Sequence, residues 1–166
     1  MAKSSQALLI VAVCFIGLLG STYSHEDFEV VGKVYCDTCR AMFETPISID
    51  MVGAEVKLEC RSRENGTITA TIEGATDDSG KYKLIVPAEN HEEDICEVTV
   101  LKSTVPECDE YVSGRDRARV VLSHESGLVS SIRIANSLGF LKKVTLPECP
   151  EVLKQLGLLP HVKVGL

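Results

Sequence analysis

The sequence is 166 residues long, 45% of them hydrophobic and 25% charged, and its formal net charge is -7. The acidic balance argues against nucleic acid or an anionic membrane as a partner, because both attract clustered lysine and arginine. One basic cluster does occur, and we interpret it as a solvated strand edge. Its members are Arg115, Arg117 and Arg119.

The N-terminus has the layout of a secretory signal peptide. Lys3 makes the first residues positive, residues 7–20 are apolar and uncharged, and small or polar residues follow as far as Ser24. The apolar run is shorter than the roughly 20 residues of a membrane-spanning helix, so cleavage after Ser24 is favoured over a membrane anchor. We predict a signal peptide over 1–24, a single secreted β domain over 25–166, and no membrane insertion after cleavage.

Removal of this segment leaves an even number of cysteines. Cys14 is lost with it, so the seven cysteines of the chain become six, and the loss of Lys3 makes the net charge -8. An even count in an oxidising compartment predicts paired sulfurs. The six are Cys36, Cys39, Cys60, Cys96, Cys108 and Cys149.

The mature chain is predicted to be all-β. Alternating or β-branched stretches recur between turn signals, at 28–34, 52–60, 68–72, 82–86, 95–101, 118–122 and 128–134. About seven short strands without βαβ alternation indicate an antiparallel Greek-key sandwich or barrel. Gly32, inside the first stretch, predicts a bulge or a close backbone approach.

One short helix is predicted near the C-terminus. Pro150 suits a first helical position, apolar residues on one face follow it, and Gly157 can end the helix. Because two helical turns are marginal alone, we expect Cys149 to hold this helix against the sheet.

Cys36 and Cys39 lie two residues apart where the first strand ends, and three kinds of site use such a spacing. A thioredoxin-type redox pair needs a helix N-terminus, and residues 40–44 are too few before Pro46 to provide one. A zinc site needs a second close pair of ligands, whereas the other cysteines and the four histidines are spread out. Structural disulfides to distant partners are favoured, with the redox pair and the metal site as alternatives.

The residues constrain the pairing only partly. Cys60 and Cys96 lie on inward-facing stripes of two strands, so they can meet across the core. Cys36 and Cys39 are then left to pair with Cys108 and Cys149. Which of the first two bonds to which of the last two stays open.

The remaining motifs indicate modification but not catalysis. Asn65-Gly66-Thr67 is a glycosylation sequon in a predicted hairpin turn, so we expect a glycan on Asn65, although Asn-Gly also favours a turn by itself. No nucleophile is matched with a histidine, and we interpret the acidic run 92–94 as a solvated loop. We predict no catalytic residue, no cofactor and no metal.

Several runs of the chain, in this order, resemble the olive-pollen-allergen family of secreted plant proteins. The run Gly32-Lys33-Val34-Tyr35-Cys36-Asp37-Thr38-Cys39-Arg40 looks like the hallmark motif of that family. Similarity continues, with all six cysteines in place, through 53–60, 76–82, 91–96, 108–110, 115–118 and 135–140. The chain is most similar to the pollen-specific members. Val31 departs from the pattern, because the family usually has Glu, Gln or Thr there.

This resemblance implies a secreted β-barrel or sandwich glycoprotein without known enzymatic activity. It also implies the disulfide pairs Cys36–Cys108, Cys39–Cys149 and Cys60–Cys96. Family members are linked to pollen hydration, pollen-tube growth and cell-surface receptor kinases.

We therefore predict an extracellular signalling or binding factor in plant cell growth. Its expected partner is a cell-surface receptor, with receptor kinases among the candidates, or a cell-wall component. The alternatives are an extracellular thiol–disulfide oxidoreductase that uses Cys36 and Cys39, and a carrier that encloses a small ligand in the barrel.

Overall fold

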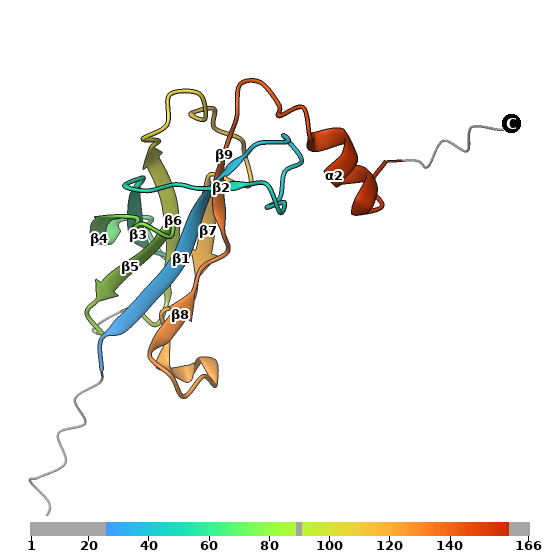
Figure 1. Cartoon of the computed structure of the whole chain (residues 1–166). Coiled ribbons are helices and arrows are strands. Elements are labelled where there is room, and N and C mark those ends of the chain that lie inside the picture. The colour runs from blue at the N-terminus through green and yellow to red at the C-terminus, as the bar shows by residue number, and fades with distance from the viewer. Residues whose placement is uncertain (1–25, 89–90, 160–166) are drawn as a thin grey trace, which may run out of the picture.

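The structure is a computed structural model that describes residues 26–88 and 91–159. Two β-sheets face each other, and a short helix, α2, lies beyond one end of them (Figure 1). The predicted signal peptide over 1–24 lies outside the described residues. Within the described part, no helix is long and apolar enough to cross a membrane.

β1 (Phe28–Asp37) is the centre of the first sheet, and every other strand of that sheet pairs with it. Its first half pairs antiparallel with β5 (Lys81–Val86) and parallel with β8 (Ile132–Ile134). Its second half pairs antiparallel with β2 (Ile49–Asp50) and parallel with β9 (Leu138–Leu141). The strand that carries the cysteine motif therefore organises a whole layer.

The second sheet is antiparallel throughout, in the order β4-β3-β6-β7. β3 spans Glu55–Ser62, β4 spans Ile68–Ala75, β6 spans Asp94–Lys102 and β7 spans Arg117–Val120. A single 3-10 turn, η1 (His124–Ser126), follows β7.

Period-two alternation places the core between the two sheets. On β5, for example, Tyr82, Leu84 and Val86 are buried while the residues between them are exposed. The inner faces of both sheets meet in one cluster of buried side chains. The largest side chains that are fully buried are Tyr35, Phe28, Phe140, Met51 and Leu58.

The all-β class, the short C-terminal helix and three disulfides confirm the predicted fold. One detail differs, because the first sheet is mixed and not purely antiparallel. The chain reaches β8 and β9 only after crossing the second sheet, so both enter beside β1 in its own direction. β9 was not predicted, since its four residues are all buried and show no alternation.

α2 (Cys149–Gln155) begins and ends where the sequence indicates. A proline occupies its first turn, and Gly157, just beyond its end, has a φ of 74°, which favours glycine. Cys149 is the one buried residue of this helix. The packing therefore agrees with the prediction that this cysteine holds the helix in place.

Gly32 permits a close approach and not a bulge. The register between β1 and β5 runs without a shift from Phe28 opposite Val86 to Lys33 opposite Lys81. The side chain of Tyr82 covers Gly32, and a Cβ at this glycine would lie 2.2 Å from the Tyr82 hydroxyl oxygen. The group that lies close to Gly32 is thus the side chain of Tyr82, and not a second stretch of backbone.

Candidate functional site

The two cysteines at the end of β1 are bonded to two different, distant partners. Cys36 is joined to Cys108, 72 residues away, and Cys39 is joined to Cys149, 110 residues away. These are the pairs that the family resemblance implies. Neither sulfur is a thiol, and the two are not joined to each other, so this arrangement lacks the exchangeable dithiol of an oxidoreductase.

The third disulfide joins Cys60 to Cys96 inside the second sheet. The two residues lie directly opposite each other on β3 and β6, with their Cα atoms 4.0 Å apart. Both are buried and face the core. Cys60 and Cys96 are therefore bonded to each other, but the expectation that they meet across the core is wrong, because they are neighbours in one sheet.

Two polar side chains between Cys36 and Cys39 fix the turn that follows β1. The Asp37 carboxylate accepts hydrogen bonds from the backbone N–H groups of Cys39 (3.2 Å) and Met42 (2.7 Å). The Thr38 hydroxyl donates to the carbonyl of Ile47 over 3.0 Å. Because Asp37 and Thr38 are buried, these bonds stabilise the loop geometry.

Arg40 extends this network to two further loops. Its guanidinium donates to both carboxylate oxygens of Glu110, over 2.7 and 2.8 Å, and to the carbonyl of Lys142 over 2.9 Å. The hydrogen bonds and positive charge of Arg40 hold the pKa of Glu110 below its ordinary value. We call residues 38–48, 103–116 and 142–148 the anchored loops.

Backbone hydrogen bonds join the same three loops. Lys143 N–H donates to the carbonyl of Glu107 over 2.9 Å, and Leu146 N–H donates to the carbonyl of Thr38 over 3.2 Å. Lys143 adds a side-chain bond to the carbonyl of Pro106. With the two disulfides, these contacts hold the loops at the end of the sheets from which α2 extends (Figure 1).

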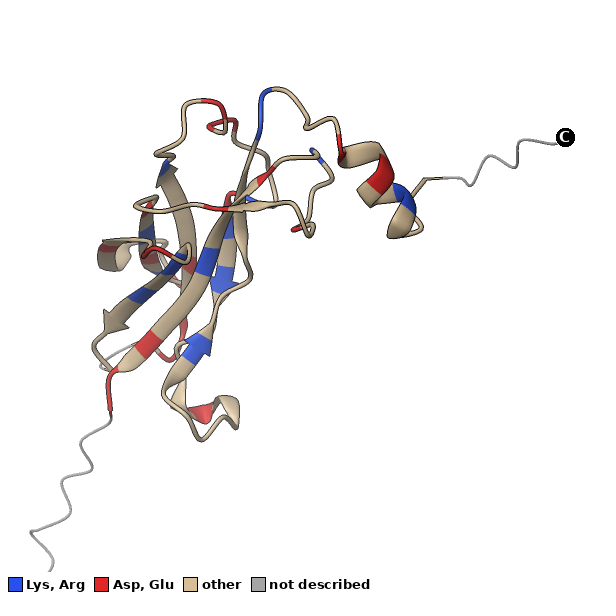
Figure 2. Ribbon diagram, in the orientation of Figure 1, with Lys and Arg blue, Asp and Glu red and all other residues tan. Residues whose placement is uncertain are grey.

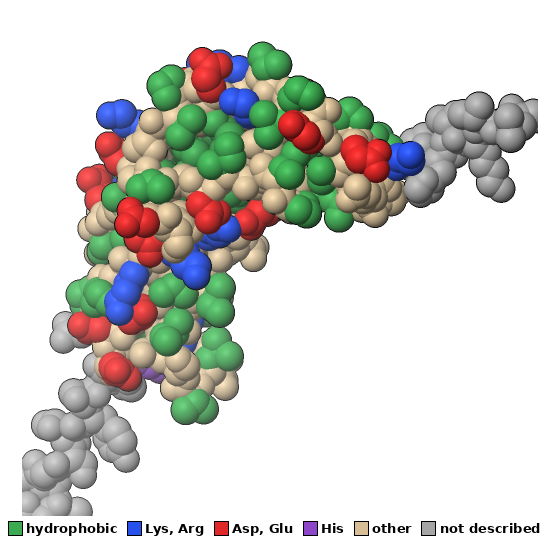
Figure 3. All heavy atoms as spheres, in the orientation of Figure 1, with side chains coloured by type: hydrophobic (Ala, Val, Ile, Leu, Met, Phe, Trp, Pro, Cys, Tyr) green, Lys and Arg blue, Asp and Glu red, His purple; other side chains and the backbone are tan. Residues whose placement is uncertain are grey.

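The anchored loops expose apolar side chains on a fixed backbone. Met42, Tyr111 and Val144 are all exposed, and Val144 is 71% exposed. Figure 3 shows hydrophobic atoms gathered over this upper end of the molecule. Exposed apolar side chains on loops that a scaffold holds in place are typical of surfaces that bind a partner.

The predicted glycosylation sequon lies in the exposed loop between β3 and β4. The Thr67 hydroxyl and N–H donate to the side-chain oxygen of Asn65 over 2.7 and 3.0 Å. Gly66, between them, has a φ of 72°. Nothing covers the Asn65 side chain among the described residues, so the site is open to a modifying enzyme.

The arginine cluster has the character of a solvated edge. Arg117 pairs with Asp116 over 3.1 Å, and Arg119 pairs with Glu97 over 3.4 Å. Both arginines are exposed, so these pairs add little to stability. Figure 2 shows acidic residues distributed over strands, loops and α2 alongside the basic ones.

The acidic run 92–94 is more ordered than a solvated loop. The Asp94 side chain is 7% exposed, and this desolvation alone would raise its pKa, but hydrogen bonds from His91 (2.9 Å) and Thr69 (2.5 Å) outweigh it and lower the pKa. Glu92 accepts hydrogen bonds from Ser123 and from the N–H of His124, which lower the pKa of Glu92. These carboxylates hold loops together, so their role is structural.

Residues 26–88 and 91–159 contain no group of three side chains placed to hold a metal ion. Of the four histidines in the sequence, His91 bonds Asp94 and His124 stacks on Phe28. His25 and His161 lie outside the described residues.

Comparisons with known proteins agree with the fold. Residues 26–157 match the family described as "Pollen protein Ole e 1 like". The chain is 46% identical to the Olee1-like protein of Betula pendula over 152 residues, which cover 90% of this chain and 91% of that protein.

Two further matches are of the same kind. The anther-specific protein LAT52 of Solanum lycopersicum is 46% identical over 154 residues, which cover 92% of this chain and 95% of that protein. The crystal structure of the major plantain pollen allergen Pla l 1 superposes with a TM-score of 0.66 at 31% identity, covering 75% of this chain and 100% of that one. The chain thus belongs to the family of pollen proteins like Ole e 1.

Proposed function

We propose that this protein is a secreted, non-catalytic binding factor that acts in the growth of plant cells, with pollen hydration and pollen-tube growth as its setting. The observation that carries the proposal is the division of Cys36 and Cys39 between two long-range disulfides. This arrangement uses both sulfurs to hold the anchored loops in place. The printed names of its relatives, an anther-specific protein among them, support a role in pollen.

The anchored loops are the surface that we assign to the partner. Met42 and Val144 lie on two loops that Arg40 joins, since Arg40 bonds the carbonyl of Lys142. Burial of such side chains is a favourable contribution to association, and a fixed backbone lowers the entropy cost of binding. A protein partner at the cell surface, such as a receptor kinase ectodomain, or a cell-wall component would provide the complementary face.

Saturable binding to intact pollen tubes tests this function. Fluorescently labelled protein should bind the tube surface, and unlabelled protein should compete. Met42→Glu and Val144→Glu place charges on the anchored loops and should each weaken binding about tenfold, as a charge in an apolar contact does. Val129→Glu is the matched control, because Val129 is fully exposed on the loop between η1 and β8, away from the anchored loops.

Binding that does not saturate, or that Val129→Glu weakens as much as Met42→Glu, would contradict the assignment. Turnover of a disulfide substrate by the native protein would contradict the non-catalytic function. Secretion is tested separately by sequencing the N-terminus of protein recovered from the medium, which should begin at His25.

A further inference from the structure

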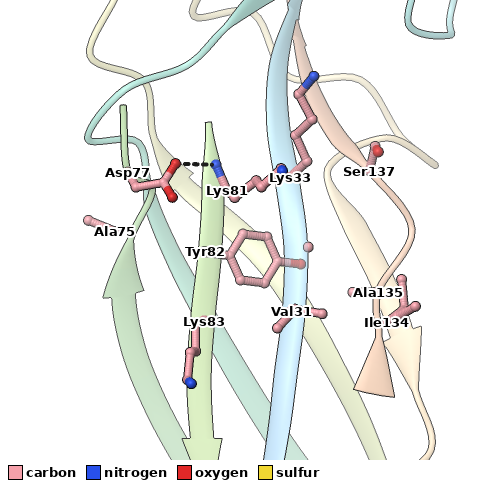
Figure 4. Close-up of a pocket in the computed structure, with 11 residues that line it drawn as sticks. Val31, Lys33, Ala75, Asp77, Lys81, Tyr82, Lys83, Ile134, Ala135 and Ser137 are labelled. Atoms are coloured by element: carbon pink, nitrogen blue, oxygen red, sulfur yellow. Dashed lines mark hydrogen bonds between the residues drawn. The ribbon is translucent and has the colours of Figure 1, made fainter. Parts of the chain in front are cut away.

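A groove of about 660 Å³ lies on the first sheet, and none of its lining residues belongs to the anchored loops. It crosses β5, β1 and the segment that follows β8, as Figure 4 shows. Its volume is in the range of sites that bind small molecules, roughly 300–1,000 Å³. The inner faces of the sheets are filled by the core, so this groove is a different place from the barrel interior that a carrier would use.

The floor of the groove is apolar and partly exposed. Val31 is opposite Ile134 in the parallel pairing of β1 with β8, and Ile134 is 82% exposed. Ala135, which is itself buried, continues the floor, and Ala75 lies at the far side across β5. Ile134 is the last residue of β8, which pairs only with β1, and an isoleucine so exposed on a strand, rather than at a loop tip, indicates a surface that gains stability when it is covered.

Three lysines border this floor, although the chain as a whole is acidic. Lys33 and Lys81 lie directly opposite each other on β1 and β5, where like charges repel, and Lys83 is opposite Val31. A pattern that breaks a local rule of sheet pairing is expected at functional positions.

Carboxylates hold two of the three lysines away from the groove. Lys33 pairs with Glu44 (2.5 Å) and Asp50 (2.7 Å), and the hydrogen bonds that its ammonium group donates to Asp50 and Glu44 raise its pKa. Lys83 pairs with Glu29 over 2.6 Å. In Figure 4, Lys33 runs along β1 and Lys83 points along β5, both away from the middle of the groove.

Lys81 differs from its two neighbours. Its side chain extends from β5 towards β1 (Figure 4), and among the described residues its ammonium group has no carboxylate within 4.0 Å. The nearby Asp77 carboxylate accepts bonds from the N–H groups of Ser79 and Lys81 and from the Ser79 hydroxyl. Lys81 therefore forms no salt bridge within 4.0 Å among the described residues, and its charge acts on Asp77 only at longer range, where it helps to lower the pKa of that carboxyl. It provides a positive charge beside an apolar floor.

We propose that this groove binds a small anionic amphiphile, a molecule with one carboxylate head and an apolar chain. The carboxylate pairs with Lys81, and the chain covers Val31 and Ile134. An acidic polysaccharide fits less well, because it presents hydroxyl groups to a floor that has few polar partners. An anionic membrane fits less well too, because Glu29 and Asp50 on the same face would be repelled by it.

Isothermal titration calorimetry of the disulfide-intact protein with monomeric dodecanoate tests this proposal. We expect saturable binding of one dodecanoate per protein, at least about tenfold tighter than that of dodecyltrimethylammonium, which has the same chain and the opposite charge. Lys81→Met keeps the apolar stem and should weaken binding about fivefold, as loss of a partly exposed ion pair does. Lys81→Arg should retain binding.

Lys102→Met is the matched control, since Lys102 is an exposed lysine of β6 in the other sheet, and it should leave the affinity unchanged. The proposal is overturned if dodecanoate does not bind, if Lys81→Met binds it as tightly as the unaltered chain, or if the cationic amphiphile binds equally well. Binding of trigalacturonate or of anionic vesicles in preference to dodecanoate would overturn it as well. These outcomes do not test the anchored loops, because neither Lys81 nor Lys102 belongs to them.

Discussion

Arg40 and Glu110, 70 residues apart, form a bidentate salt bridge between the turn after β1 and the loop between β6 and β7. Each carboxylate oxygen accepts one guanidinium N–H, a geometry that lysine cannot reproduce. Arg40 has a φ of 53°, which is uncommon for a residue other than glycine. The pair and the two adjacent disulfides together hold this backbone in place.

Glu110→Gln should lower the Tm at neutral pH and leave it unchanged in strong acid. Because folding lowers the pKa of Glu110, its contribution is present above the unfolded-state pKa and is lost as the pH falls through the folded-state pKa. Calorimetric scans of both proteins between neutral and strongly acidic pH measure the difference. Arg40→Lys keeps the positive charge but not the paired hydrogen bonds, so at neutral pH it should lower the Tm less than Glu110→Gln does. A Tm difference that does not depend on pH would contradict this account.

Removal of the Cys39–Cys149 disulfide should cost about 2–5 kcal/mol in the free energy of unfolding. The bond closes a loop of 110 residues and holds α2, in which no other residue is buried. Denaturant unfolding of Cys39→Ser/Cys149→Ser measures this cost, and the double variant avoids a free thiol. Cys39→Ser alone should be no more stable than the double variant, and a Tm equal to that of the unaltered protein would refute the role of this bond.

Gly32→Ala should destabilise the protein by about 1–3 kcal/mol, the usual cost of overpacking. The added methyl group would lie 2.2 Å from the hydroxyl oxygen and 2.4 Å from Cζ of Tyr82, so the ring must move. The matched variant Tyr82→Leu removes the ring, and Gly32→Ala should cost less in that background. Additive effects of the two substitutions would show that they do not interact.

Tyr82→Phe should leave stability unchanged or raise it. The Tyr82 hydroxyl is buried and has no hydrogen-bond partner among the described residues, and burial raises its pKa. Loss of a buried hydroxyl without a partner removes a desolvation cost. Denaturant unfolding checks this, and a loss above about 1 kcal/mol would indicate that the hydroxyl has a partner.

Asn65 should carry a glycan when the protein is secreted from plant cells. The sequon is exposed, and the Thr67 hydroxyl already bonds the Asn65 side chain. Mass spectrometry before and after enzymatic deglycosylation should show a loss of mass that Thr67→Ala abolishes. Ser62→Ala, just outside the sequon, is the control and should remain glycosylated. An unmodified Asn65 in secreted protein would contradict the prediction.

The parts of the fold that the sequence predicted are those that depend on local patterns. Alternation identified β3, β5, β6 and β7, and Pro150 with Gly157 identified α2. β9 was missed because a strand buried on both faces does not alternate. Its parallel pairing with β1 depends on a long crossover that no local pattern records.

The candidate site was predictable only in its sulfurs. The two cysteines marked the end of β1, and the family resemblance supplied their partners. The Arg40–Glu110 pair joins residues far apart in the chain, and each of them is an ordinary surface charge in the sequence. The groove at Lys81 depends on which lysines have carboxylate partners, and that is visible only in three dimensions.

A disulfide map of the secreted protein tests the central claim most directly. Thiols should be alkylated before proteolysis without reductant, and the cross-linked peptides identified by mass spectrometry. The account predicts three links, Cys36–Cys108, Cys39–Cys149 and Cys60–Cys96, with none of these cysteines alkylated. Alkylated Cys36 or Cys39, or a peptide in which these two are joined to each other, would contradict it.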